Sequence, residues 1–210
     1  MKKCIAWILA VCLLCFSFGG CGQSSPASII GTWENTVDIS EYLTYKMGDS
    51  VFAGYIQLKD IPMYLHYTFT EDGSFTVKVN EQKTQKSWDK FLDEIIKGVE
   101  KAFVASFPDR SVKDFFDSYE KENGVSMRQT LAEKNKMSDL LTSFENNGYY
   151  VVQGNRLYRF AEKEKTEITD DTVYELFSLK GKTLTILSST DPKLTAEEKA
   201  KYPYEFQWVK

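Results

Sequence analysis

The chain has 210 residues, of which 42% are hydrophobic and 27% are charged, and its formal net charge at pH 7 is −4. A chain of this length can bury a core without disulfide or metal support, which excludes the small disulfide-bonded scaffolds. The acidic balance excludes a general nucleic-acid-binding surface and attachment to anionic lipids through a basic patch.

The first 20 residues have the layout of a secretory signal. Lys2 and Lys3 form a basic end, an apolar run follows from Cys4 to Phe18, and Gly19 and Gly20 are small. The apolar run is 15 residues long. A membrane-spanning helix needs about 20. We therefore predict a cleaved signal peptide over residues 1–20.

The residues around this cleavage point, Phe18, Gly19, Gly20 and Cys21, resemble the lipobox of bacterial lipoproteins. The resemblance implies cleavage between Gly20 and Cys21 and transfer of a diacylglyceryl group to the sulfur of Cys21. Phe18 departs from the pattern, because lipoproteins usually have Leu at this position. The alternative is ordinary signal cleavage that leaves Cys21 as a free thiol. As a lipoprotein, the mature chain would be extracytoplasmic and anchored to the cell membrane by its N-terminal lipid.

Signal cleavage also changes the composition of the mature chain. Three of the four cysteines lie in the signal, so Cys21 is the one that stays, and neither an internal disulfide nor a cysteine metal site can form. Loss of Lys2 and Lys3 takes the net charge from −4 to −6. Residues 21–28 are mostly small or polar and predict a short tether before the folded domain.

Strand signals dominate the first part of the domain. Alternating apolar residues predict a strand over 29–39, and Ser40 is the predicted cap of a short helix that runs to Gly48. Three further strands are predicted over 54–58, 63–70 and 74–79. Asp72 and Gly73 separate the last two and predict a tight hairpin turn.

The hydrophobic period then changes from two to between three and four residues. A helix is predicted from about Gln85 to the neighbourhood of Pro108, because Trp88, Phe91, Ile95 and similar residues fall on one face. Two more helices are predicted over 112–122, capped by Ser111, and over 127–145, capped by Ser126. The middle of the third, residues 133–136, is too polar to ensure continuity.

Strand signals return after the helices. Five strands are predicted over 149–153, 156–161, 172–179, 183–188 and 204–209. Gly154 with Asn155, and Gly181 with its flanking lysines, predict two hairpin turns. Residues 195–201 predict a helical turn before the closing strand.

Nine strand candidates around a helical block predict a mainly β (α+β) fold, an antiparallel barrel or strongly curved sheet interrupted by two or three helices. Gly31, Thr32 and Trp33, just after the tether, resemble the Gly-x-Trp that opens lipocalin barrels, and the hairpins and final aromatic strand fit the same family. This resemblance implies one lipocalin-like (calycin-type) domain over 29–210. The helical insertion at about 85–147 departs from the family pattern.

Signals for catalysis are absent from the sequence. His66 is the one histidine, and the chain has no nucleophile, phosphate-loop or calcium-loop motif. We therefore predict no catalytic residue, metal site or cofactor. Aromatic residues are abundant enough to line a pocket, and the candidates for ligand contact are Trp33, Tyr67, Phe69 and Trp208, although aromatic residues at regular spacing are more often core.

These observations favour a noncatalytic, membrane-anchored binding protein for a small apolar or amphipathic ligand. One alternative is a scaffolding lipoprotein whose helical insertion docks an envelope protein. A more remote alternative is an envelope hydrolase with paired carboxylates in a cleft. Nucleic acid is not an expected partner.

Overall fold

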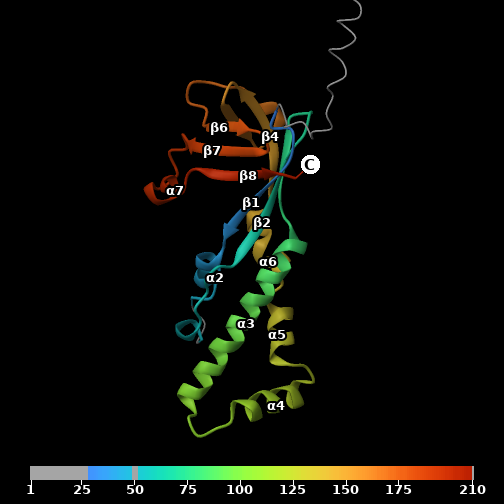
Figure 1. The fold of residues 1–210 in the computed structure, drawn as a ribbon, viewed down its shortest axis with the longest axis vertical. Helices are drawn as coiled ribbons and strands as arrows, with labels where there is room; N and C mark the ends of the chain where they lie inside the picture. The colour runs from blue at the N-terminus through green and yellow to red at the C-terminus, as the bar shows by residue number, and fades with distance from the viewer. Residues whose placement is uncertain (1–27, 49–51, 210) are drawn as a thin grey trace, which may run out of the picture.

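The computed structural model describes residues 28–48 and 52–209. Eight antiparallel strands form a closed barrel in which each strand pairs with the next and β8 pairs with β1 (Figure 1). The predicted barrel with a helical insertion is thereby confirmed. The predicted signal peptide, Cys21 and the predicted tether up to residue 27 lie outside the described residues. The strands are β1 (Gly31–Asp38), β2 (Pro62–Phe69), β3 (Ser74–Val79), β4 (Asn146–Gln153), β5 (Arg156–Phe160), β6 (Glu175–Lys180), β7 (Thr183–Ser189) and β8 (Tyr204–Trp208).

The predicted hairpin turns join neighbouring strands as expected. Gly73 and Gly181 have φ angles of 79° and 58°, which a residue without Cβ adopts easily. Asp72 closes the β2–β3 turn by accepting hydrogen bonds from the Thr70 hydroxyl at 2.5 Å and from the Ser74 amide at 3.0 Å. The bond from Thr70, with those from Ser74, lowers the pKa of Asp72 to about 2.

At two places around the barrel, neighbouring strands pair over only a short stretch, and we call these places seams. β5 and β6 pair at Arg156–Leu176 and Leu157–Glu175, and β8 and β1 pair at Trp33–Trp208 and Glu34–Gln207. Between these seams, β1–β5 and β6–β8 each form a continuous ladder, and the two groups cross at a steep angle (Figure 1). The barrel therefore consists of two sheets joined near one end.

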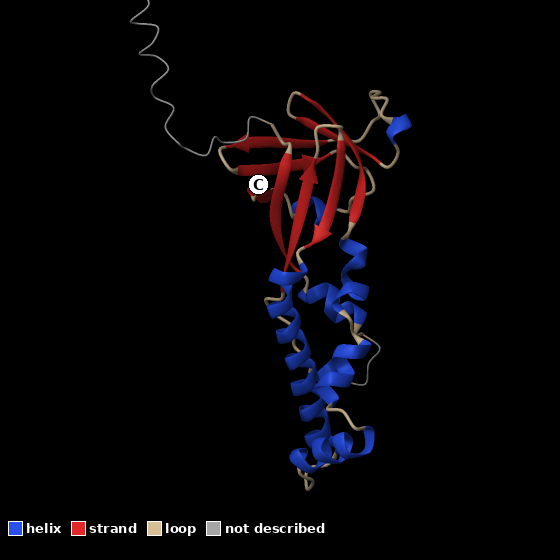
Figure 2. Cartoon of the chain, turned by 90° about the vertical axis from the view of Figure 1, so that its right-hand side faces the viewer, coloured by secondary structure: helices blue, strands red, loops and turns tan. Residues whose placement is uncertain are grey.

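The helical insertion connects β3 to β4 (Figure 2). It extends from the end of the barrel opposite the two seams. It consists of α3 (Glu81–Ser106), α4 (Val112–Asn123), α5 (Met127–Lys134), α6 (Met137–Leu141) and the 3-10 turn η2 (Thr142–Phe144). Asn80, Ser111 and Ser126 cap the first three helices through their side chains. Within the part of the chain that the structure describes, no helix has both the length and the apolar character needed to cross a membrane.

The core continues from the barrel into the insertion. The apolar face of α3 packs with α2 (Ser40–Lys46), the 3-10 turn η1 (Ala53–Tyr55) and the chain leading to β2, and Ile39, Leu43 and Ile61 are fully buried there. The buried residues of α3 include Trp88, Phe91, Leu92, Ile95 and Val99. Two small elements, η3 (Lys163–Lys165) and α7 (Ala196–Ala200), precede β6 and β8, and α7 confirms the helical turn expected at 195–201. Every element lies between residues 31 and 208, so a chain that begins at residue 22 retains the whole described fold.

The strand predicted over 54–58 is wrong, so three strands and not four precede the insertion. Residues 53–55 form η1, and Ile56 packs against α3 at Gly98 instead of pairing with a strand. Ser40 is also not the cap of α2. The N-cap is Ile39, and the carboxylate of Asp38 accepts hydrogen bonds from the Ser40 amide at 2.9 Å and the Ser40 hydroxyl at 2.5 Å.

Two helix boundaries differ from the prediction. α3 begins at Glu81, four residues earlier than expected, because Asn80 caps it directly after β3. The predicted helix over 127–145 is broken, since α5 ends at Lys134 and α6 begins at Met137 in the polar stretch that made continuity uncertain. β4 starts at Asn146 and takes up residues expected in a turn.

Candidate ligand-binding site

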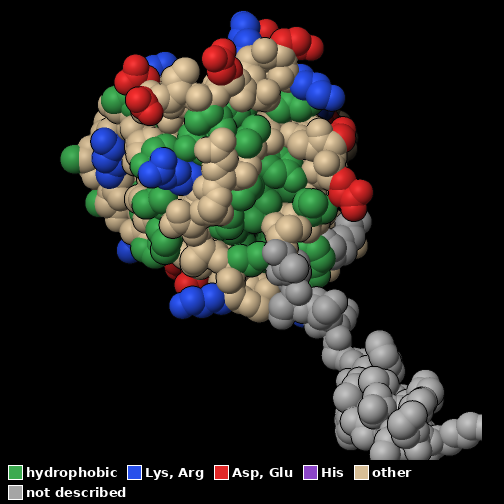
Figure 3. All heavy atoms as spheres, turned by 90° about the horizontal axis from the view of Figure 1, so that it is seen from above, with side chains coloured by type: hydrophobic (Ala, Val, Ile, Leu, Met, Phe, Trp, Pro, Cys, Tyr) green, Lys and Arg blue, Asp and Glu red, His purple; other side chains and the backbone are tan. Residues whose placement is uncertain are grey.

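One end of the barrel is closed by tryptophan packing. Trp33 is fully buried, its Nε1 donates a 2.7 Å hydrogen bond to the Ile29 carbonyl, and its ring meets Trp208 edge-on at 5.0 Å between centroids. This is the end where the described chain enters the barrel, opposite the helices (Figure 1). Hydrophobic side chains gather on it when it is viewed directly (Figure 3).

The barrel also contains a cavity of about 310 Å³. This volume lies at the lower end of the range of small-molecule sites, about 300–1,000 Å³. Most of the lining is apolar, and Phe144 of η2 reaches it from the insertion. The apolar and aromatic lining residues are Val37, Leu65, Tyr67, Phe69, Phe144, Leu157, Leu184, Ile186, Tyr202, Tyr204 and Phe206.

A partly exposed ion pair lies in the wall of this cavity, since the Arg159 side chain is 37% exposed. Nη2 of Arg159 on β5 donates to Oε1 of Glu175 on β6 at 2.6 Å, and the Glu175 side chain is 13% exposed. Burial raises the pKa of Glu175, and the Arg159 charge and hydrogen bond only partly offset this. The pair bridges the β5–β6 seam beyond the last residues that the two strands pair.

Other polar groups reach the cavity near the ion pair. The Tyr67 ring meets Phe206 edge-on at 4.8 Å, and burial raises the pKa of its hydroxyl. Asn35 donates a 2.7 Å hydrogen bond to the Glu205 carbonyl and so bridges the β8–β1 seam. A ligand with one polar end would find donors and acceptors here.

A second hollow of about 360 Å³ lies on the other side of the ion pair, and we call it the vestibule. Leu157, Arg159 and Glu175 line both the cavity and the vestibule, so they form the partition between them. The rest of the vestibule lining is more polar than the cavity and comprises Phe75, Asn146, Asn147, Phe160, Ala161, Val173, Tyr174, Ser189 and Asp191.

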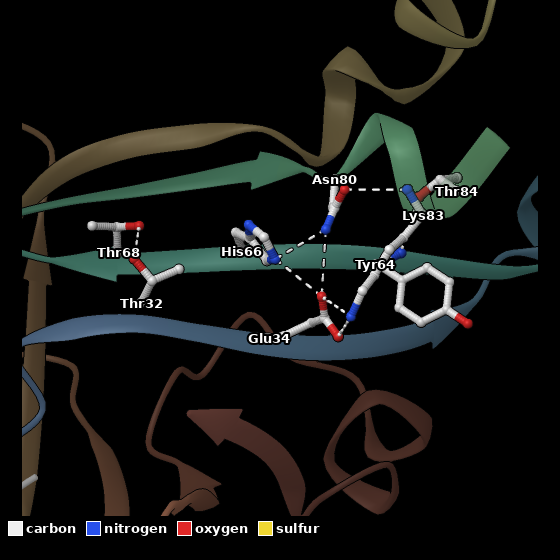
Figure 4. Close-up of polar contacts among 8 residues, drawn as sticks. All are labelled: Thr32, Glu34, Tyr64, His66, Thr68, Asn80, Lys83 and Thr84. Atoms are coloured by element: carbon white, nitrogen blue, oxygen red, sulfur yellow. Dashed lines mark hydrogen bonds and ion pairs between the residues drawn. The ribbon is translucent and has the colours of Figure 1, made fainter. Parts of the chain in front are cut away.

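The single histidine belongs to a cluster on the outer wall (Figure 4). His66 Nε2 lies 3.0 Å from Glu34 Oε2 and 3.1 Å from Asn80 Nδ2, and Lys83 donates to both Glu34 oxygens at 2.7 and 2.9 Å. Burial acts to raise the pKa of Glu34, but the bonds from Lys83 and His66 outweigh it and hold that pKa below its ordinary value. The cluster attaches the start of α3 to β1 and β2, which is a structural role.

Across 28–48 and 52–209, no three acidic, histidine or cysteine side chains are placed to share a metal ion. No family model, curated protein or solved structure matches this chain. Functional conclusions therefore rest on the geometry of the cavity and the vestibule.

The four predicted ligand-contact residues fall into two groups. Tyr67 and Phe69 line the cavity, whereas Trp33 and Trp208 pack at the closed end and do not line it. Sequence reasoning missed Arg159 and Glu175. Arg159 lies on the same face of β5 as Leu157, and Glu175 lies on the same face of β6 as Phe177. A charged residue among the apolar residues of one strand face was therefore the available signal.

Proposed function

We propose that this protein is a noncatalytic binding protein that holds one small apolar or amphipathic molecule in its barrel. The supporting observation is the cavity of about 310 Å³, apolar over most of its wall and polar near Arg159. Eight-stranded barrels are about wide enough to hold one small ligand when side chains leave the space free. Burial of an apolar molecule there would be favourable by about 25 cal/mol per Å² of surface removed from water.

Binding of the neutral dye Nile red to residues 22–210 tests this proposal. We expect dye fluorescence to rise on binding and to be competed by single-chain lipids. Val37→Phe adds a ring to the cavity lining and should weaken binding at least tenfold. Val152→Phe is the matched control, because Val152 is 39% exposed and lies outside that lining. Failure of Nile red and of lipids to bind would end the proposal.

We also propose that Cys21 is lipidated and anchors the protein to the extracytoplasmic side of the membrane. The lipobox resemblance motivates this. The fold is compatible, because the described chain begins at the closed end, where Ile30 and Val209 are 38% and 45% exposed. The cavity and the insertion would then face away from the membrane. Cys21→Ala should leave folding intact and release the protein from washed membranes, whereas retention at high salt would refute the anchor.

A scaffolding role for the insertion is the second candidate. α4 and α5 contain no buried residue, and Val104 and Phe107 near the tip are 48% and 45% exposed. Phe115 stacks on Phe103 at 4.4 Å, so it is only partly available to a partner. A photocrosslinker at Phe107 should capture one discrete envelope protein in cells, and a crosslinker at Lys121 should not. Equal or absent capture at both positions would exclude this role.

A further inference from the structure

The partition between cavity and vestibule is made of side chains. Along the β5–β6 seam, backbone pairing stops at Leu157 and Glu175, and the Arg159 side chain crosses to Glu175. Separation of this one ion pair would connect the two spaces, because Leu157 is the one other residue that lines both. The seam is therefore the shortest route from the vestibule into the barrel.

The cavity is mainly apolar and the vestibule is more polar, as the tail and the head of an amphiphile are. The cavity walls are mainly aliphatic and aromatic, while the vestibule presents the amides of Asn146 and Asn147, the Ser189 hydroxyl and the Asp191 carboxylate. A cavity of about 150 Å³ accepts benzene, so one of about 310 Å³ suits a tail of roughly ten carbons. The tail would fill the cavity and the polar head would lie at the partition.

The charges at the partition indicate which head fits. A carboxylate head would lie beside the Glu175 and Asp191 carboxylates, while the single Arg159 charge is already paired with Glu175. An ammonium head would instead approach Arg159. Like charges brought together in a poorly solvated site are unfavourable. An uncharged head with hydroxyl and carbonyl groups can accept from Arg159 and donate to Glu175 without breaking the charge balance.

We propose that the ligand is a single-chain amphiphile with an uncharged, hydrogen-bonding head, selected by the Arg159–Glu175 pair at the β5–β6 seam. This inference rests on the proposed binding function and specifies the ligand class. Arg159 and Glu175 act as the selectivity residues, and the cavity supplies most of the affinity.

Three amphiphiles with the same ten-carbon acyl or alkyl length test the inference by displacing Nile red from residues 22–210 at pH 8. They are monodecanoylglycerol, decanoate and decylamine, each used below its micelle concentration. We expect monodecanoylglycerol to bind at least tenfold more tightly than either charged compound. If Nile red binds and all three amphiphiles displace it with equal affinity, the head-group selection is refuted. The proposed binding function would then remain intact.

Glu175→Gln provides the decisive variant, because it leaves the Arg159 charge unpaired at nearly constant shape. Decanoate should gain about tenfold relative to monodecanoylglycerol, and decylamine should gain nothing. Glu34→Gln is the matched control, since Glu34 is 14% exposed and salt-bridged like Glu175 but lies on the outer wall. An unchanged ratio in Glu175→Gln, or the same change in Glu34→Gln, would overturn the proposal.

A second variant covers the case in which Glu175→Gln does not fold. Arg159→Met combined with Glu175→Leu replaces the pair with apolar side chains of similar size, a change that is often neutral or stabilising. Nile red should still bind, which shows an intact cavity, while monodecanoylglycerol should lose about tenfold in affinity. Undiminished monodecanoylglycerol binding in this variant would contradict the proposed role of the pair.

Discussion

Two glutamates of this barrel have similarly exposed side chains and opposite pKa shifts. Glu34 and Glu175 have side chains that are 14% and 13% exposed. Burial raises the pKa in both cases, but Glu34 is bonded to Lys83 and His66, which outweigh burial, whereas Glu175 has Arg159 alone. Stronger desolvation at Glu175 and the additional partners at Glu34 together decide the sign.

For Glu34, the lowered folded pKa predicts stability that is present above pH of about 4.3, the ordinary glutamate value, and is lost as the pH falls through the folded pKa. Glu34→Gln should reduce the free energy of unfolding by about 1 kcal/mol at pH 7, a small value because Lys83 is half exposed. Urea denaturation of both proteins from pH 7 to pH 3 checks this. A difference that does not shrink at low pH would contradict it.

For Glu175, the sign is reversed. Its raised folded pKa means that the folded state binds more protons than the unfolded state between pH of about 4.3 and the folded pKa, so stability falls as the pH rises through that window. The stability of the native protein relative to Glu175→Gln should therefore decline from pH 4 to pH 8. A relative stability that increases over the same range would show that Arg159 overcomes burial.

At the scale of elements, the contact between η1 and α3 depends on Gly98. A Cβ at this position would lie 2.2 Å from Cγ1 of Ile56, so Gly98→Ala should reduce the free energy of unfolding by about 1–3 kcal/mol. Ile56→Ala removes the clashing atoms. In the Ile56→Ala background, Gly98→Ala should therefore leave the free energy of unfolding nearly unchanged. Chemical denaturation in a double-mutant cycle measures this coupling.

Gly148 provides the control for that cycle. Its added Cβ would lie 2.3 Å from the Phe160 carbonyl oxygen, a backbone atom that no side-chain change can remove. Gly148→Ala should therefore destabilise the barrel with or without Ile56→Ala. Additive effects of Gly98→Ala and Ile56→Ala would show that the α3–Ile56 contact is looser than described.

The sequence predicted elements whose own residues decide their structure. The helical period from Trp88 onward and the turns at Gly73 and Gly181 depend on local chemistry, and all appear in the structure. The region around Ile56 was misassigned because its packing partner, Gly98, is 42 residues away. The Arg159–Glu175 pair was missed for a different reason, because the register of the short β5–β6 pairing, which places the two side chains together across the loop between the strands, has no signal in the sequence.

At the scale of the molecule, stability should decrease from the barrel to the tip of the insertion. Strands β2 and β3 bury Leu65, Phe75 and Val77, whereas α4 and α5 bury no residue. Elements with few buried contacts open at low free energy. Amide hydrogen exchange should therefore be at least tenfold faster in α4 and α5 than in β2. Uniform protection would indicate that the insertion folds as one unit with the barrel.

Methyl chemical shifts measured while monodecanoylglycerol is added to residues 22–210 test most directly whether the barrel cavity holds a ligand. We expect saturable shifts for Leu65, Leu184 and Ile186, which line the cavity, and little change for Ile95 and Val99 in the buried face of α3. Shifts confined to the exposed Val104 and its neighbours at the tip, with the cavity methyls unchanged, would contradict it.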